Sequence, residues 1–411
     1  MEAFLLSLDF LLNNVFNPLY LYRHFNSKIW LLIVRHQNST YHCDFILIFK
    51  MYITLVLIIT VTLLIFFVIN LPVFGKLPTG KRLNKIKNLS NYLDGEIKNL
   101  SLTPVKPEDV SYWQMLGKVI EGNKNGSPKK TIPHQIPDFT SSEEFKITWF
   151  GHSSYLIQVD GKNILVDPVF SKRTSPFQFL GTKGFEGTDF IKPEELPNLD
   201  IILITHDHYD HLDYNSILKL KNKTKYFLTS LGVGSHLENW GILPEKIIEL
   251  AWGEEAFPLE NISFTAANAR HFSGRLFKRN RTAWSSFILK TKNNKIYLGG
   301  DSGYDTHFKI IGETYGPFDL AILECGQYNA MWPLIHMVPE EVTQASLDLN
   351  AKHLLPVHWG KYRLALHDWD DSIKRVVKSA KDLNISILTP ELGQTLKLKD
   401  NWDFKPWWAN L

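Results

Sequence analysis

Cysteine is scarce in this sequence, which has only Cys43 and Cys325 among its 411 residues. The two lie far apart, so a framework of disulfide bonds is excluded as the basis of the fold. Zinc sites built from several cysteines are excluded for the same reason. Any metal ion in this protein must therefore be held by histidine, aspartate or glutamate, and the sequence contains 15 histidines.

A strong excess of one charge is also absent. The formal net charge is +3, which is too small to indicate nucleic acid as a partner. Hydrophobic residues make up 44% of the chain and charged residues 21%, as in globular proteins. The length allows one large domain or two ordinary ones. Composition does not indicate an oligomeric state.

One long stretch of the sequence lacks charge entirely. Met51–Ile69 reads MYITLVLIITVTLLIFFVI, and a helix of this length spans about 28 Å, close to the hydrocarbon thickness of a bilayer. The alternatives are a buried core helix, which would usually keep a polar face, and a cleaved signal peptide, which would be followed by an A-x-A-like site. We therefore predict a single-pass transmembrane anchor over residues 51–70.

Basic residues flank this stretch unequally. Arg35 and Lys50 are the nearby ones before it, and five follow it closely: Lys76, Lys81, Arg82, Lys85 and Lys87. Because lysine and arginine concentrate on the cytoplasmic side of a membrane span, this pattern favours a cytoplasmic location for the chain that follows.

The first 50 residues show no clear hydrophobic period, and Met51 is a natural start for a protein with a short anchor. We expect residues 1–50 to be an upstream extension rather than a functional part. The alternative is an amphipathic or second apolar segment around Phe4–Phe16.

The remaining chain divides by composition. Residues 71–145 are rich in Pro, Asn and Lys, and their stretch Glu121–Lys130 is typical of a solvated loop. We expect a membrane-proximal arm here rather than an independent domain. Regular strand and helix patterns cover residues 146–397, the predicted main domain, and residues 398–411 follow as a C-terminal tail.

Strand patterns dominate the main domain. Ile201–Thr205 (IILIT) is a continuous apolar run, typical of a strand buried on both faces, and Asp160-Gly161 predicts a hairpin turn. Pro339–Leu349 predicts a helix, with Pro in its first turn followed by two Glu. The other predicted strands are 146–150, 155–159, 164–166, 226–229, 285–291, 295–298, 320–323 and 353–357. Hairpins followed by strand–helix alternation indicate a layered α/β fold with mixed sheets.

The densest group of polar side chains follows the IILIT strand directly, in the run His206-Asp207-His208-Tyr209-Asp210-His211. Three imidazoles and two carboxylates so close together are costly to desolvate unless something pairs with them. A turn after a strand aims alternate side chains at one point, so His206 and His208 can share a metal ion. Asp210 and His211 can reach a second. Imidazole and carboxylate suit Zn²⁺ and tolerate Mn²⁺ or Fe; the alternative is a polar surface loop.

This HxHxDH pattern after a hydrophobic strand resembles the signature of the metallo-β-lactamase superfamily, whose fold is a four-layer αββα sandwich. The resemblance implies three further metal ligands, each at the end of a strand. The sequence supplies candidates in the right order, namely His271, Asp301 and His358. A metallo-β-lactamase domain preceded by a transmembrane helix is therefore the predicted architecture.

The resemblance also implies two Zn²⁺ ions per chain. The first ion would be held by His206, His208 and His271, the second by Asp210, His211 and His358, and Asp301 would bridge them. A hydroxide between the ions would be the nucleophile, because paired cations lower the pKa of bound water.

Five segments resemble, more narrowly, the family of N-acyl-phosphatidylethanolamine-hydrolysing phospholipase D and its bacterial relatives. They are WFGHSS at 149–154, HDHYDHLD at 206–213, GGDSGY at 299–304, HMVPEE at 336–341 and VHWG at 357–360. The run FGKLP at 74–78 also matches the approach to the domain in that family. The resemblance covers roughly residues 72–397.

Further roles follow from this resemblance. His336 matches a histidine that lies over the metal centre and contacts substrate, so His336 and Asp301 are the predicted catalytic residues. The alternative for His336 is a helix-flanking residue beside Pro339. His152, Asp207 and Asp213 are expected to support the metal ligands from outside the ligand set.

These observations predict a zinc-dependent hydrolase, most specifically a phosphodiesterase of the phospholipase D type that acts on N-acyl phosphatidylethanolamine-like lipids at a membrane. A lactonase or esterase with a small, phosphorylated substrate is the enzymatic alternative. Two departures from the animal phospholipase pattern count against the lipid substrate, namely Ile335, where that enzyme carries a polar residue, and the N-terminal anchor. A membrane-tethered binding module without catalysis is the alternative of another class, and the complete ligand set argues against it.

Overall fold

The computed structural model describes residues 39–276 and 278–411. The chain divides after Ile69 into two units, of which the second is Asn70–Leu411. Most of the predicted extension, residues 1–38, lies outside the described residues.

The described part of the first unit is one long helix, α4 (Ser39–Ile69). Its segment Leu47–Ile69 is long and apolar enough to cross a membrane, and the protein buries none of it. Thr60 and Thr62 donate their hydroxyl hydrogens to backbone carbonyls one turn earlier, which removes two polar groups from the apolar surface. The helix begins well before Met51, the start that we predicted, because the apolar run at 45–49 extends the same pattern.

The second unit is built on two mixed sheets, with seven strands each among the described residues. The first sheet has the order β18-β3-β4-β5-β6-β7-β8. Its strands are β3 (Lys146–Trp149), β4 (Tyr155–Val159), β5 (Lys162–Val166), β6 (Leu199–Ile204), β7 (Thr224–Ser230), β8 (Ile247–Leu250) and β18 (Thr395–Lys397).

The second sheet has the order β17-β16-β15-β14-β13-β10-β9. Its strands are β9 (Glu255–Leu259), β10 (Ile262–Ala267), β13 (Ser286–Lys290), β14 (Lys295–Leu298), β15 (Leu320–Glu324), β16 (His353–Val357) and β17 (Ser386–Ile387). Strands β5 to β8 are parallel to one another, and so are β14 to β17. Parallel strands place their carboxyl ends at one edge of each sheet.

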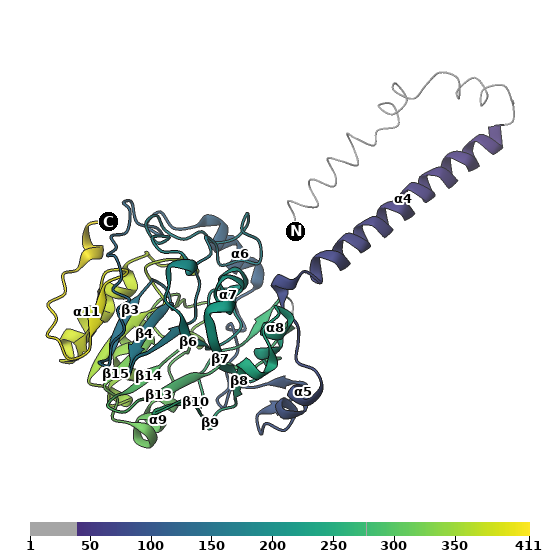
Figure 1. Cartoon of the computed structure of the whole chain (residues 1–411). Helices are drawn as coiled ribbons and strands as arrows, with labels where there is room; N and C mark the ends of the chain where they lie inside the picture. The colour runs from purple at the N-terminus through teal and green to yellow at the C-terminus, as the bar shows by residue number, and fades with distance from the viewer. Residues whose placement is uncertain (1–38, 277) are drawn as a thin grey trace. The chain divides into compact units, whose positions relative to one another are not determined.

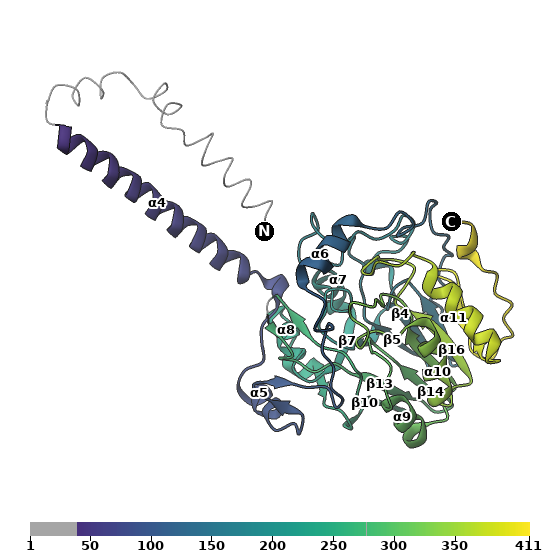
Figure 2. The same cartoon turned by 180° about the vertical axis from the view of Figure 1, so that it is seen from behind.

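Helices cover the outer faces of both sheets, which gives the predicted αββα sandwich (Figures 1 and 2). In the first sheet, Ile201 and Leu203 of β6 face the core that both sheets share, whereas Ile202 and Ile204 face outward. The outward core includes residues of α7 (Tyr214–Leu220) and α8 (Gly234–Asn239). The other outer layer contains α9 (His307–Tyr315), α10 (Pro339–Asp348) and α11 (Asp371–Asp382).

The predicted arm, residues 71–145, belongs to the second unit. It contains α5 (Gly80–Lys87), the hairpin β1 (Tyr92–Leu93) and β2 (Glu96–Ile97), and α6 (Tyr112–Glu121). Ile86, Ile97 and Ile132 of this segment are fully buried. A second small hairpin, β11 (Gly274–Arg275) and β12 (Lys278–Arg279), lies in the loop after β10.

The C-terminal residues also pack on the sandwich. Strand β18 pairs with β3 and closes the first sheet. In the predicted tail, Trp408 is 4% exposed and joins the central core. Trp407 stacks on Trp359, with ring centroids 5.1 Å apart. Residues 398–411 are therefore part of the domain rather than a separate tail, because their tryptophans supply apolar area that the core buries.

We predict that Trp408→Ala lowers the free energy of unfolding by about 3–5 kcal/mol, the usual cost of removing a buried tryptophan side chain. Trp113→Ala is the matched control, since Trp113 is 70% exposed. The control should change the unfolding free energy by less than about 0.5 kcal/mol. Urea denaturation followed by circular dichroism measures both, and equal values for the two variants would contradict the packing described for the C-terminal residues.

Candidate metal centre

The predicted ligands come from loops at the carboxyl ends of strands in both sheets. The run 206–211 follows β6, His271 follows β10, Asp301 follows β14 and His358 follows β16. All of these side chains meet at one edge of the sandwich, and His206, His211, His271, Asp301 and His358 are buried. The fold thus gathers ligands that are up to about 150 residues apart in sequence.

One group of donor atoms consists of His206, His208, His271 and Asp301. The Nε2 atom of His206 lies 2.9 Å from Nδ1 of His208, and Nε2 of His271 lies 3.3 Å from the same atom. The two Nε2 atoms lie 3.8 and 3.7 Å from Oδ2 of Asp301. Ligands at zinc–nitrogen distances form a tetrahedron with edges of roughly 3.3 Å, so this spacing fits one Zn²⁺.

A second group consists of His152, Asp210, His211 and His358. Oδ2 of Asp210 lies 2.9 Å from Nε2 of His152, 3.6 Å from Nε2 of His211 and 4.0 Å from Nε2 of His358. Asp301 reaches this group too, because its Oδ2 lies 3.1 Å from Nε2 of His211 and its Oδ1 lies 3.2 Å from Nδ1 of His358. One carboxylate therefore touches both groups, as a bridging ligand does.

The chemistry of these donors fits metal cations. Oδ1 of Asp301 is buried and has no hydrogen-bond partner among the described residues, which is costly unless a cation takes its place. Burial would raise the pKa of Asp301, but His211 and His358 outweigh it and hold that pKa well below its usual range. Burial lowers the pKa of His206, His271 and His358 well below the ordinary value. Neutral imidazoles and an ionised carboxylate are the forms that bind metal.

Other residues orient the ligand histidines from behind, as such contacts do in metal sites. Asp167, directly after β5, has its Oδ2 2.8 Å from Nδ1 of His211 and also accepts hydrogen bonds from the Thr205 backbone and hydroxyl. Nδ1 of His271 lies 2.9 Å from the Ile335 carbonyl oxygen. The Ser153 hydroxyl lies 2.9 Å from Nδ1 of His358. Each of these contacts fixes the orientation of one imidazole ring.

Asp167 is absent from the site residues that we predicted from the sequence. A signal was present, because Asp167 ends the strand next to IILIT, as His206 ends IILIT itself. Side chains at the carboxyl ends of neighbouring parallel strands lie close together, so this strand pairing places Asp167 near the loop that begins at His206.

Three residues at the site have a left-handed backbone that non-glycine residues rarely adopt. They are His152 (φ 51°), Asp167 (φ 40°) and His358 (φ 68°). Backbone hydrogen bonds between two loops hold two of them in place, since the His358 N–H donates to the His152 carbonyl and the His152 N–H donates to the Trp359 carbonyl. Strained backbone of this kind concentrates at functional sites, where the surrounding structure over-determines it.

The three expected supporting residues have different positions. His152 lies beside Asp210, close enough to belong to the second donor group itself. Asp207 instead accepts hydrogen bonds from Thr282 and the Gly274 backbone, and lies 3.2 Å from His236. Asp213 caps helix α7 and accepts hydrogen bonds from Ser171.

The hydrogen bonds of Asp207 and Asp213 therefore anchor the loop to neighbouring segments. Neither carboxylate bonds to a predicted ligand histidine among the described residues, contrary to our expectation. Consecutive residues in a turn point in different directions, so proximity in sequence gave no contact with the ligands.

The two glycines before Asp301 let the backbone pack closely. A Cβ atom at Gly299 would lie 2.6 Å from the Ile322 carbonyl oxygen, and one at Gly300 would lie 3.0 Å from the Thr205 side chain. Gly300 has a φ of +62°. The absence of a Cβ lets the end of β14 approach the neighbouring strands, which brings Asp301 next to the loop after β6.

His336 lies over the donor groups, from the loop before α10. Its ring centroid is 5.1 Å from that of His271 and 5.4 Å from that of His358, and it is near enough to Asp301 and His358 to form a third donor group. Nδ1 of His336 lies 3.3 Å from Oε1 of Glu324, at the end of β15. Glu324 was not predicted, although it too is an acid at a strand end.

Burial raises the pKa of Glu324 to about 7. Burial would lower the pKa of His336, but the Glu324 carboxylate outweighs it and raises that pKa above the ordinary value. The pair can therefore hold a proton at neutral pH, next to the donor groups and on the side where His336 remains partly accessible.

Comparison with known proteins agrees with this geometry. Residues 162–359 match the family model of a beta-lactamase superfamily domain. The chain is 36% identical over 329 residues to an uncharacterized protein of Mycobacterium tuberculosis (strain ATCC 25618 / H37Rv), and the match covers 77% of this chain and 87% of that protein.

Two further relatives carry functional names. The chain is 31% identical over 299 residues to N-acyl-phosphatidylethanolamine-hydrolyzing phospholipase D 1 of Caenorhabditis elegans, covering 67% of this chain and 83% of that protein. It is 30% identical over 256 residues to a metal-dependent hydrolase of Saccharolobus solfataricus, covering 62% and 99%. With its fold and its two donor groups at one edge of the sandwich, the chain belongs to the metallo-β-lactamase superfamily and is one of its metal-dependent hydrolases.

Proposed function

We propose that this protein is a two-zinc phosphodiesterase of the phospholipase D type that hydrolyses N-acyl phosphatidylethanolamine-like lipids. The observation that carries the proposal is the contact of Asp301 with both donor groups, at 3.1 Å from His211 and 3.7–3.8 Å from His271 and His206. A shared carboxylate holds two cations close together, the arrangement that suits displacement at phosphorus. The likeness to a named phospholipase D of Caenorhabditis elegans supports the substrate class.

In this proposal, His206, His208 and His271 hold one ion, Asp210, His211 and His358 hold the other, and Asp301 bridges them. Bound there, two Zn²⁺ ions would polarise the phosphoryl oxygens and lower the pKa of water. His152 adds a nitrogen beside Asp210, and the neighbouring Asp167 keeps the His211 ring in position. Because the ligand loops are buried, these side chains need no rearrangement before substrate binds.

His336 and Glu324 supply the proton chemistry. Water attacks phosphorus, the bond from phosphorus to the ethanolamine oxygen breaks, and that oxygen must take up a proton. Glu324 holds Nδ1 of His336 at 3.3 Å, which leaves Nε2 of the ring for the substrate. A protonated His336 can then donate to the leaving oxygen, and the products are a phosphatidic acid and an N-acyl ethanolamine.

Exposed apolar side chains on the second unit support a lipid substrate. Helix α6 begins with a capping box at Ser111 and Gln114, so it is a well-formed helix. Yet it buries no residue, and Trp113 and Ile120 are largely exposed. Phe179 is 81% exposed in the loop after β5. A partly apolar helix without a protein partner is typical of segments that lie in a lipid surface.

The same proposal places the protein at a membrane through Leu47–Ile69, with the catalytic unit on the cytoplasmic side. Some of the basic residues that favour this orientation form ion pairs with acidic residues of the protein. Arg82 pairs with Glu238 and Glu249, and Lys85 pairs with Glu254. Lys76 and Lys81 form no ion pair within the described ranges and remain to interact with anionic lipid.

Metal content tests the bridging role directly. We predict that the purified protein binds about two zinc ions per chain and that Asp301→Asn binds no more than one, with diester cleavage reduced by at least about a thousandfold. Asp400→Asn, an exposed carboxylate, is the matched control and should keep both. The measurements are elemental analysis and cleavage of bis(p-nitrophenyl) phosphate beside an N-acyl phosphatidylethanolamine.

Each outcome of that assay separates one function from another. Two zinc ions without diester cleavage would favour a lactonase or esterase, to be tested on small lactones and esters. Two zinc ions without turnover of any of these would favour a binding module. A folded protein that binds no metal would overturn the proposal.

The proton-donating role of His336 gives a second prediction. His336→Gln should lower kcat for the lipid by about 10²–10⁴-fold. It should lower kcat for bis(p-nitrophenyl) phosphate much less, because p-nitrophenolate leaves without a proton. Glu324→Gln should show the same pattern more weakly. Equal losses on both substrates, with zinc content unchanged, would mean that His336 positions substrate instead.

The membrane anchor gives a third prediction. The full chain should remain in the membrane pellet after washing with sodium carbonate at high pH, since a span of this length inserts stably. Residues 70–411 should be released by that wash, even if the exposed face of α6 binds lipid at neutral pH. Retention of residues 70–411 in the washed pellet would show that attachment does not depend on α4.

A further inference from the structure

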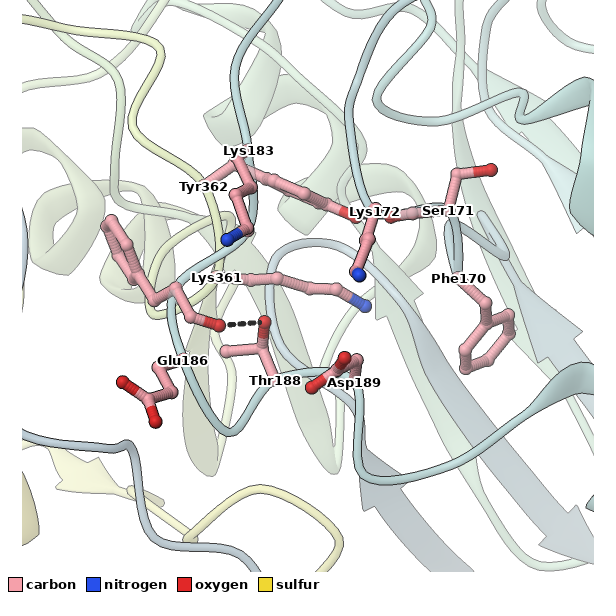
Figure 3. Close-up of a pocket in the computed structure, with 11 residues that line it drawn as sticks. Phe170, Ser171, Lys172, Lys183, Glu186, Thr188, Asp189, Lys361 and Tyr362 are labelled. Carbon is pink, nitrogen blue, oxygen red and sulfur yellow. Dashed lines mark hydrogen bonds between the residues drawn. The ribbon is translucent and has the colours of Figure 1, made fainter. Parts of the chain in front are cut away.

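A cavity of about 310 Å³ lies beside the metal centre and none of the predicted metal ligands lines it. Figure 3 shows its wall, which comes from the long loop between β5 and β6 and from Lys361 and Tyr362, just after the HWG segment. Small-molecule sites begin at about this volume. The cavity was not foreseen from the sequence, and nothing in the proposed reaction uses it.

Three lysines line this cavity, namely Lys172, Lys183 and Lys361. In Figure 3 the ammonium groups of Lys172 and Lys361 point toward the same space, and that of Lys183 lies apart from them on the cavity wall. Two acids, Glu186 and Asp189, line it too; the Glu186 carboxylate points away from the ammonium groups, whereas the Asp189 carboxylate lies on the side of the Lys361 ammonium. Neither Lys172 nor Lys183 forms an ion pair with any residue in the described ranges. The interior of the cavity is therefore positive.

Lys361 is the unusual member, because it is only 3% exposed. Its Nζ donates one hydrogen bond, of 2.8 Å, to the Val169 carbonyl oxygen. It lies 5.3 Å from the Phe170 ring centroid and 5.5 Å from that of Tyr362. No carboxylate forms an ion pair with Lys361 in the part of the chain that is described, and burial lowers its pKa to about 8. A buried ammonium with donors to spare is stabilised by an anion.

Hydrogen bonds hold the wall of the cavity rigid. The Phe185 N–H donates to the Lys361 carbonyl at 2.8 Å, and the Tyr362 hydroxyl donates to the Ser171 carbonyl at 2.6 Å. The Gly184 N–H donates to the Lys172 carbonyl at 2.9 Å. These bonds join residues 171–172 and 184–185 of the loop to each other and to the segment after His358, so the backbone that carries the three lysines is held in place.

We propose that this cavity is a binding site for a phosphate monoester group, held by Lys172, Lys183 and Lys361. Lysine binds phosphate as a point charge, and several ammonium groups match a dianion better than a singly charged carboxylate. The cavity exceeds the size of the phosphate group alone, which leaves room for part of the molecule that carries it. The inference does not rest on the proposed phospholipase activity, because no ligand of the metal centre takes part.

The position of Tyr362 places this cavity next to the second donor group. The Tyr362 ring packs edge-on against His152, with centroids 5.4 Å apart. His152 in turn lies 2.9 Å from Asp210. A phosphate in the cavity therefore lies behind the second donor group, separated from it by one layer of side chains.

The test uses the full chain in a neutral detergent, freed of metal by chelation so that phosphate cannot bind zinc. Isothermal titration with inorganic phosphate at pH 7.5 and low salt should show one saturable site. Lys361→Met should weaken binding by about tenfold or more, and Lys183→Gln severalfold, because each removes one charge from the cavity. Lys183 is exposed, so its substitution keeps the test valid if Lys361→Met fails to fold.

Lys309→Gln is the control, since Lys309 is an exposed lysine on α9, outside the cavity. It should leave the affinity for phosphate unchanged. Absence of saturable binding, or an affinity that Lys183→Gln and Lys309→Gln change equally, would overturn the proposal. Competition then identifies the source of the phosphate group. Displacement by glycerol 3-phosphate supports a site for soluble esters, and displacement only by dihexanoyl phosphatidic acid supports a site for a lipid headgroup.

Discussion

The structure depends on the crowding of imidazole and carboxylate groups at one edge of the sandwich. Seven histidines and two aspartates form its three overlapping donor groups, with donor atoms as close as 2.9 Å. So many buried polar groups, with an Asp301 oxygen that lacks a partner, are costly in a protein interior unless cations neutralise them. The two-sheet frame makes this crowding possible, because parallel strands in both sheets end at the same edge.

The frame and the site constrain each other. Gly299 and Gly300 let β14 end against the neighbouring strands, which places Asp301 between the loops of both sheets. Asp167 links the end of β5 to His211 and to the start of the loop after β6. His152 and His358, both with a left-handed backbone, are joined by one bond, in which the His358 N–H donates to the His152 carbonyl. The rigid core offsets the free-energy cost of the strained backbone. The donor side chains are therefore in place before a metal ion binds.

The protein surfaces around the metal centre differ in charge and polarity from one side to another. On one side, His336 lies beside the donor groups with its Nδ1 3.3 Å from the Glu324 carboxylate. On another, Lys361 and its neighbours line a positive cavity behind His152. The exposed apolar residues of α6 and the apolar segment Leu47–Ile69 of α4 are the two features that the proposed function assigns to lipid contact. A hydrolase of phosphate esters at a membrane would use all three kinds of surface, although each depends on different residues.

The sequence by itself determined the features that local patterns express. HDHYDH after IILIT predicted which residues of the first loop join the donor groups, and strands such as 155–159, 295–298 and 353–357 have the predicted bounds, because alternation and buried apolar runs are local signals. Only the tertiary structure decided the contacts between distant segments. Asp167 and Glu324 became part of the site, Asp207 and Asp213 bonded elsewhere, and Lys361 met Lys172 and Lys183 in one cavity. The physical reason is that side-chain direction at the end of a strand depends on loop conformation and on neighbours from both sheets, which local patterns do not encode.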